Sequence, residues 1–149
     1  LRDDIESGES YFIVEIKSLK RILDESKKPE PLLCIIDEVL RGTNTIERIA
    51  ASSRILAALH QNWVIPFAAT HDIELSYILE DLYDNYHFEE EVKEKEVVFS
   101  YILKKGRATS RNAIRLLDML EYDLGIVEGA AKAARDFEEK GVWESLKPV

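Results

Sequence analysis

The chain has 149 residues, of which 46% are hydrophobic, and 20 lysines and arginines against 29 aspartates and glutamates give it a net charge of −9. This length suffices for one domain with a real core, and the acidity excludes a segment that grips nucleic acid by itself through clustered basic side chains. No run approaches the roughly 20 apolar residues that span a bilayer. The single cysteine, Cys34, lies in an apolar run. We therefore expect a cytoplasmic protein without a membrane segment and with a reduced, buried thiol.

The first part of the chain predicts a helix, a strand and a second helix. Apolar residues recur at spacings of three and four between residues 10 and 28, which is typical of an amphipathic helix. The run from Leu32 to Ile36 is apolar without alternation, which predicts a strand buried on both faces. A second helix is expected to begin after Asn44, an N-cap with Glu47 three residues on, and to end near residue 61.

A second apolar run, residues 65–69, predicts another strand, followed by a helix to about residue 82. Alternating strands and helices predict an α/β sheet, in which functional groups gather at the carboxyl ends of the strands. The first strand is followed by Asp37 and Glu38, and the second by the sequence Thr-His-Asp that contains His71. These two strand ends are therefore the first places to look for chemistry.

The last third of the chain predicts a hairpin and two helices. Apolar residues alternate with polar ones over residues 86–92 and 97–103, which indicates two antiparallel strands. Helical periodicity follows over residues 110–122 and 126–140, and Gly141 is placed to end the second helix.

Four apolar residues followed by Asp37 and Glu38 have the form of a Walker B segment. The first carboxylate suits Mg²⁺ or its water shell, because hard cations prefer carboxylate oxygens. The second can orient and polarise water for attack on phosphorus. An acidic pair after a strand is equally typical of a solvated turn or a helix cap, so the pair alone leaves both interpretations open.

His71 has several interpretations. It suits a sensor of a terminal phosphate, a metal ligand or a polar group that ends a strand, and a lone histidine is usually structural. Together with Asp37, Glu38 and Asp72 it also fits a metal-dependent phosphohydrolase. The two other histidines show no matching ligand spacing, which makes that hypothesis the weakest.

The segment Ser-Gly-Glu-Ser at residues 7–10 precedes the first predicted helix. Backbone N–H groups, hydroxyls and the positive end of a helix dipole bind anions there. An ordinary N-cap is the alternative.

Three segments occur in a recognised order: residues 7–16, 33–45 and 67–75 read SGESYFIVEI, LCIIDEVLRGTNT and FAATHDIEL. Together they resemble the ATPase domain of the MutS family over most of residues 1–140. In that family the first is the ABC-class signature, the Asp-Glu and Arg-Gly-Thr-x-Thr of the second are Walker B and the D-loop, and the Thr-His of the third carries the switch histidine.

The resemblance implies a P-loop NTPase of ABC type, present here as a partial domain with a sheet and flanking helices, a β-hairpin and a C-terminal helical pair. Residues 1–149 would be the C-terminal part of that ATPase domain, and the helices within 110–141 would pack across a homodimer. It also implies ATP and Mg²⁺ as cofactors, and coupling of ATP turnover to mismatched or structured DNA.

The resemblance further implies a role for each motif residue. Asp37 would hold Mg²⁺ through water, Glu38 would be the general base, and His71 would donate to the γ-phosphate of ATP. The signature would contact the γ-phosphate bound to the partner subunit, and the D-loop would carry signals across the interface. Besides Asp37, the cofactor-binding residues implied are Ser7, Gly8, Ser10, Gly42, Thr43 and Asn44.

Three residues depart from the familiar mismatch-repair pattern. Tyr11 stands where the family often has Thr, Leu40 replaces a common Gly after Walker B, and Asp72 occupies a position where an aromatic residue is frequent. These changes leave the ATPase motifs intact. They leave open a second hypothesis, a non-catalytic dimerisation module of a MutS paralogue that has no part in mismatch repair.

No phosphate loop of the form Gly-x-x-x-x-Gly-Lys-Ser/Thr occurs in the 149 residues. The chain begins at Leu1, and its sole methionine is Met119. We therefore expect a piece of a longer protein whose phosphate loop and DNA-contacting regions lie upstream, and little ATP hydrolysis by the piece alone.

Overall fold

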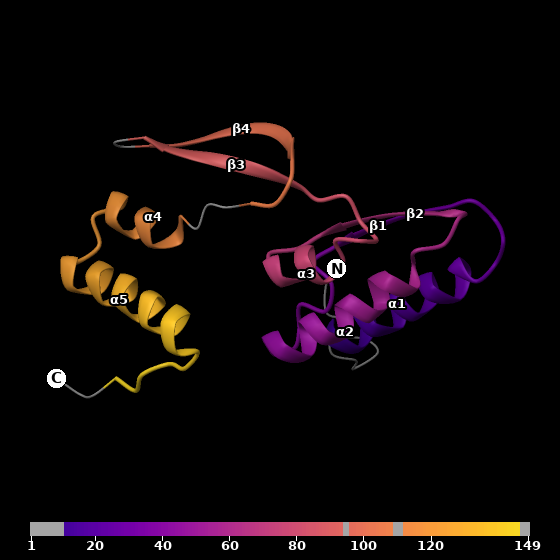
Figure 1. The fold of residues 1–149 in the computed structure, drawn as a ribbon, viewed down its shortest axis with the longest axis horizontal. Helices are drawn as coiled ribbons and strands as arrows, with labels where there is room; N and C mark the ends of the chain where they lie inside the picture. Colours follow the sequence, from indigo (N-terminus) through magenta and orange to yellow (C-terminus); the bar gives the residue numbers. More distant parts are fainter. Residues whose placement is uncertain (1–10, 94–95, 109–111, 147–149) are drawn as a thin grey trace. The chain divides into compact units, whose positions relative to one another are not determined.

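A computed structural model of the chain describes residues 11–93, 96–108 and 112–146 (Figure 1). The chain divides into two compact units, Leu1–Asn85 and Tyr86–Val149, and each is described by itself. In the described parts, no helix is long and apolar enough to cross a membrane.

The first unit is a small α/β layer. Its elements are α1 (Tyr11–Ser26), β1 (Leu32–Asp37), α2 (Thr45–Ala58), β2 (Val64–Ala69) and α3 (Ile73–Ile78). The two strands pair in parallel, with Leu32 opposite Val64 and Asp37 opposite Ala69. The carboxyl ends of β1 and β2 are therefore level with each other, and the two strands expected from the apolar runs are both present.

Helices α1 and α2 lie on the same side of the two-stranded sheet (Figure 1). The core forms between them and the strands, and it includes Leu19 of α1, Leu56 of α2 and the buried Cys34 of β1. Burial raises the pKa of the Cys34 thiol, because the thiolate would lose its hydration there. The expected burial of this thiol is confirmed.

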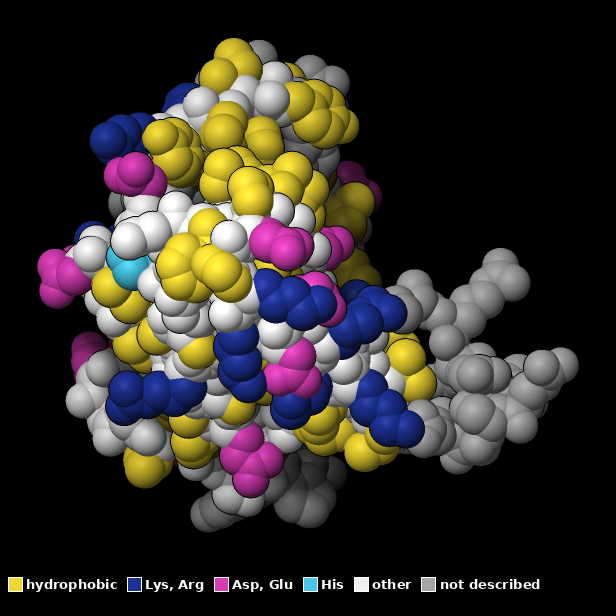
Figure 2. Space-filling model, turned by 90° about the vertical axis from the view of Figure 1, so that its right-hand side faces the viewer, with side chains coloured by type: hydrophobic (Ala, Val, Ile, Leu, Met, Phe, Trp, Pro, Cys, Tyr) yellow, Lys and Arg dark blue, Asp and Glu magenta, His cyan; other side chains and the backbone are white. Residues whose placement is uncertain are grey.

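The prediction that β1 is buried on both faces is wrong in this structure. Cys34 and Ile36 are buried, whereas Leu33 and Ile35 are 62% and 75% exposed. The physical reason is that both packing helices cover the same face, so the described residues of this unit leave the opposite face open. Figure 2 shows another side of the protein, on which hydrophobic side chains gather in the upper part and most of the Lys and Arg side chains lie in the lower half.

The helix boundaries of this unit follow local capping. The Asn44 side chain accepts a hydrogen bond from the Glu47 backbone N–H at 3.0 Å, which confirms Asn44 as the N-cap of α2. The helix ends at Ala58, earlier than expected. Helix α3 ends at Ile78, with Leu79 as its C-cap, and is therefore also shorter than the helix expected to reach about residue 82.

The second unit contains the predicted hairpin, β3 (Tyr86–Lys93) with β4 (Glu96–Lys105), and the predicted pair of helices, α4 (Ala113–Met119) and α5 (Leu124–Lys140). Gly141 adopts a φ of 71° and donates its N–H to the Phe137 carbonyl at 2.8 Å, so it ends α5 as expected. The first residues expected in the helical pair, 110 and 111, lie outside the described residues.

Candidate functional site

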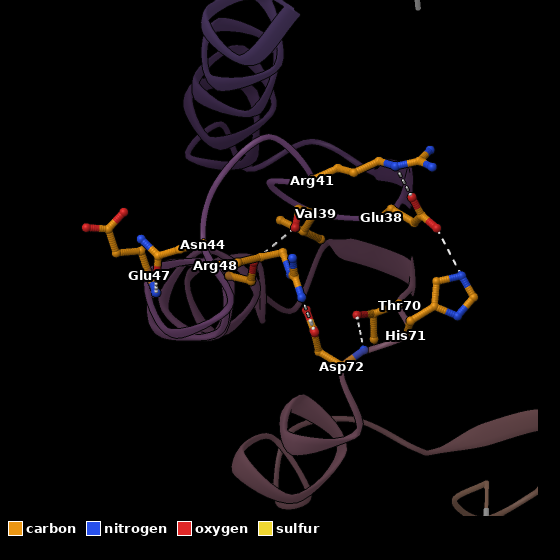
Figure 3. A network of polar contacts seen from close by, with 10 residues as sticks. Glu38, Val39, Arg41, Asn44, Glu47, Arg48, Thr70, His71 and Asp72 are labelled. Atoms are coloured by element: carbon orange, nitrogen blue, oxygen red, sulfur yellow. Dashed lines mark hydrogen bonds and ion pairs between the residues drawn. The ribbon is translucent and has the colours of Figure 1, made fainter. Parts of the chain in front are cut away.

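The level ends of β1 and β2 bring Glu38 and His71 together. The Glu38 backbone N–H donates to the carbonyl of Ala69 at 3.0 Å, which extends the ladder by one residue. Beyond it, the His71 Nε2 lies 3.0 Å from the Glu38 Oε1 (Figure 3). Glu38, which follows β1, and His71, which follows β2, therefore contact each other at the carboxyl ends of the two strands.

The second oxygen of the same carboxylate is also bound. Arg41 Nε lies 3.0 Å from Glu38 Oε2, so the carboxylate lies between a guanidinium and an imidazole. The Glu38 side chain is 26% exposed and that of His71 is 91% exposed. The imidazole is therefore in solvent, while the carboxylate is partly sheltered. Sequence reasoning missed Arg41 as a partner, although its i+3 spacing from Glu38 was a signal.

The backbone of the loop that follows β1 is strained. Glu38 and Leu40 have φ angles of 53° and 58°, in the left-handed region that favours glycine. Each such residue costs about 1 to 3 kcal/mol. Leu40, which stands where a glycine was expected from the family pattern, is nevertheless buried in the core.

Glu15 of α1 holds this strained loop. Its Oε1 accepts hydrogen bonds from the Leu40 N–H at 2.6 Å and from the Arg41 N–H at 3.3 Å. Glu15 is buried, and its Oε2 has no hydrogen-bond partner among the described residues. Sequence reasoning missed Glu15; the signal was an acidic residue four positions before the core residue Leu19, on the apolar face of α1.

The loop that follows, which contains Gly42, packs against the start of α1. A Cβ added at Gly42 would lie 2.9 Å from Cδ2 of Phe12, so only glycine fits without movement. Thr43 donates from its hydroxyl to a Glu47 carboxylate oxygen at 3.0 Å, and Asn44 caps α2. Asn44 and Glu47 lie apart from Glu38 and His71 in Figure 3.

A second ion pair fixes the residue after His71. Arg48 of α2 donates from its Nε to one Asp72 oxygen at 2.7 Å and from a terminal nitrogen to the other at 2.6 Å. The Asp72 side chain is only 10% exposed. Asp72 raises the pKa of Arg48, with smaller contributions from Glu38 and Glu74. Asp72 also donates its backbone N–H to the Thr70 hydroxyl at 3.0 Å.

The remaining predicted residues are placed differently. Asp37, the last residue of β1, has an exposed side chain. Ser7, Gly8 and Ser10 lie outside the described residues. No cluster of three or more acidic, histidine or cysteine side chains with metal-binding geometry occurs in the described ranges. One exposed carboxylate fits Mg²⁺, which is usually held by one or two carboxylates together with substrate phosphates and water.

The phosphohydrolase hypothesis required four side chains to converge on metal ions. Asp72 instead forms its bidentate pair with Arg48, and Glu38 is bound by His71 and Arg41. These contacts leave that hypothesis without geometric support.

Comparison with known proteins identifies the family of this arrangement. Residues 1–138 match the family model described as MutS domain V. The DNA mismatch repair protein MutS of Aquifex pyrophilus is 33% identical over 148 residues, which cover 97% of this chain and 17% of that protein. The DNA mismatch repair protein MutS of Thermus thermophilus is 29% identical over 128 residues, 86% of this chain and 16% of that protein. The DNA mismatch repair protein MutS 2 of Haloarcula marismortui is 30% identical over 139 residues, 91% of this chain and 14% of that protein. The chain thus spans about a sixth of the length of these curated relatives.

Proposed function

The chain belongs to the MutS family, and we propose that it is the later part of a P-loop ATPase domain of ABC type, in a protein that couples ATP turnover to the handling of mismatched or structured DNA. The observation that carries the proposal is the meeting of Glu38 and His71 at the level ends of two parallel strands. Acidic and phosphate-sensing groups at this edge suit a nucleotide, because ligands of α/β sheets bind outside the carboxyl ends of the strands.

In this proposal three side chains act on the nucleotide. Asp37 would hold Mg²⁺ through water, and such a cation would supply positive charge next to the phosphates. Glu38 accepts a proton from the attacking water, and His71 donates from its ring to the γ-phosphate. Glu38 is bound at both oxygens in the structure. Each carboxylate oxygen has two lone pairs, so one contact per oxygen leaves the carboxylate able to accept a proton from water.

The open face of the sheet supports a partial domain. Leu33 and Ile35 of β1 and Ile65 and Phe67 of β2 are all more than half exposed. Contiguous apolar surface of this kind is normally covered in a finished α/β domain. We propose that residues upstream of this chain, which include the missing phosphate loop, cover this face and complete the sheet.

The partners in this proposal are a second copy of the protein and DNA. Ser7, Gly8 and Ser10 bind the γ-phosphate held by the partner copy, and the loop formed by Gly42, Thr43 and Asn44 transmits the nucleotide state between copies. The helices within residues 110–141 contribute to the dimer contact, and DNA binds through regions absent from this chain. The cytoplasmic location stays a prediction.

The test is Glu38→Gln in the complete protein. Loss of the proton acceptor should lower the rate constant of ATP hydrolysis by about 100-fold or more, whereas the dissociation constant for ATP should change little, because glutamine keeps the shape of the side chain. The measurements are phosphate release and equilibrium binding of a labelled nucleotide. Glu30→Gln, an exposed substitution on a surface turn, is the matched control and should leave both values unchanged.

The alternative function, a non-catalytic dimerisation module, predicts no ATP hydrolysis that Glu38→Gln could lower. A complete protein that forms dimers but neither binds nor hydrolyses ATP would favour that alternative. Hydrolysis that continues at the parental rate in Glu38→Gln would remove Glu38 from its role as base.

A further inference from the structure

We propose that the Arg48–Asp72 ion pair is a positioning device that holds His71 in place and links it to the loop at residues 42–44. The inference rests on the proposed ATPase function. It assigns a role to Arg48, which lies outside the three recognised segments, and to Asp72, which departs from the family pattern within the third. Neither residue is expected to touch the nucleotide.

The first argument is the geometry of the pair. A guanidinium that donates twice to one carboxylate fixes both the distance and the orientation of that carboxylate. Both side chains are largely sheltered from solvent, with 25% and 10% exposure. An ion pair in such a place is more rigid and less screened than one on an open surface.

The second argument is what the pair immobilises. Asp72 directly follows His71, and its backbone N–H is bound to the Thr70 hydroxyl at 3.0 Å, so the turn is held on both sides of the histidine. Asp72 also occupies the N-cap position of α3, yet its side chain makes no capping hydrogen bond. The Asp72 carboxylate therefore binds Arg48 of α2 and does not cap α3.

The third argument is the route from the pair to the loop. Arg48 lies one helical turn after Asn44, and its backbone N–H donates to the Asn44 carbonyl at 2.9 Å. A displacement of the loop at residues 42–44 would thus tilt the first turn of α2 and move the guanidinium. Because the guanidinium holds Asp72, the displacement would reach His71, whose ring contacts Glu38 at 3.0 Å (Figure 3).

The fourth argument is charge. Without Arg48, the Asp72 carboxylate would remain sheltered and unpaired in the turn that presents His71, where the γ-phosphate is proposed to bind. An unpaired carboxylate that is sheltered from water is costly and would favour another conformation of this turn. The arginine neutralises Asp72, which makes an acidic residue tolerable in this turn.

The test is a double-mutant cycle in the complete protein, with Arg48→Ala, His71→Ala and both together. The rate constant of ATP hydrolysis is measured per nucleotide-binding site, with sites counted by bound labelled nucleotide. We expect Arg48→Ala to lower this rate constant by about 10- to 100-fold, the effect of misplacing a reacting group, with a smaller change in KM. In the His71→Ala background the same substitution should change it by less than about threefold, because the group it positions is gone.

Two further variants guard against simple unfolding. Arg48→Lys keeps the charge but loses the double contact, and it should give an intermediate rate constant. The exchanged pair Arg48→Asp with Asp72→Arg should recover part of the loss. Lys28→Ala, which breaks the exposed Lys28–Glu25 pair of 2.7 Å, is the control and should have no effect.

The outcomes separate the two proposals. If Glu38→Gln abolishes hydrolysis but Arg48→Ala leaves the rate constant per site unchanged, the positioning role is wrong and the ATPase assignment stands. Equal losses from Arg48→Ala in the presence and absence of His71 would also overturn the positioning role. If Glu38→Gln has no effect on hydrolysis, the role of Glu38 as base fails, whereas a complete protein that neither binds nor hydrolyses ATP would overturn the ATPase assignment itself.

Discussion

Glu15 is a buried carboxylate whose hydrogen-bond donors are the backbone N–H groups of Leu40 and Arg41. Its contribution lies in holding a strained loop, since Leu40 has a φ of 58°. A side chain that serves two backbone donors at once compensates for a non-glycine residue in the left-handed region. The hydrogen bond to Glu15 thus helps to hold Leu40 in a conformation that glycine, the residue common in the family at this position, adopts more easily.

We predict that Glu15→Ala lowers the free energy of unfolding by about 1 to 3 kcal/mol, because two buried donors lose their acceptor. Glu15→Gln should cost less, since its amide oxygen can still accept from Leu40. The measurement is urea unfolding followed by circular dichroism. Lys20→Ala, which removes an exposed ion pair with Asp24 on the same helix, should change the value by less than about 1 kcal/mol. Equal losses from Glu15→Ala and Lys20→Ala would contradict the role of Glu15.

At the scale of elements, helix α1 and the loop after β1 are packed too closely for any side chain at Gly42. The nearest atom to an added Cβ would be Cδ2 of Phe12, at 2.9 Å. This contact joins the helix that follows the signature segment to the loop that resembles a D-loop. Helix α1 and the loop after β1 are therefore in contact through a glycine and an aromatic ring.

We predict that Gly42→Ala lowers the free energy of unfolding by about 1 to 3 kcal/mol, the usual cost of overpacking. Combining it with Phe12→Leu should cost less than the sum of the two single changes, which chemical unfolding of the four proteins in a double-mutant cycle measures. The control is Gly129→Ala in α5, where an added Cβ meets nothing within 4 Å and the helix should gain about 0.5 to 1 kcal/mol. Additive losses at Gly42 and Phe12 would refute the contact.

At the scale of the whole molecule, the 149 residues contain acidic and histidine groups suited to a nucleotide but no phosphate loop. We predict that the chain by itself releases phosphate from ATP no faster than a Glu38→Gln variant of the same chain. The physical reason is that the backbone cradle and lysine that hold the phosphates are missing. Phosphate release that depends on Glu38 in the chain alone would contradict this prediction.

Much of the fold could be predicted because it depends on local pattern. Spacings of three and four residues predicted α1, and short apolar runs predicted β1 and β2. A general rule of α/β sheets also directed attention to the two strand ends that carry Glu38 and His71, although not to their contact. Contacts made by Glu15 and Arg48 could not be predicted, since each joins residues 24 or more positions apart. Their partners depend on how the helices pack on the strands.

The sequence by itself determined the types of element, the order of the motifs and their resemblance to the MutS family, because these depend on near neighbours along the chain. Only the tertiary structure decided that the described residues of the first unit leave one face of the sheet open, since burial depends on which side α1 and α2 cover. It alone also revealed that Glu15 supports the loop after β1 and that Arg48 holds Asp72. These contacts arise because packing brings charged side chains on two helices against the carboxyl ends of the strands.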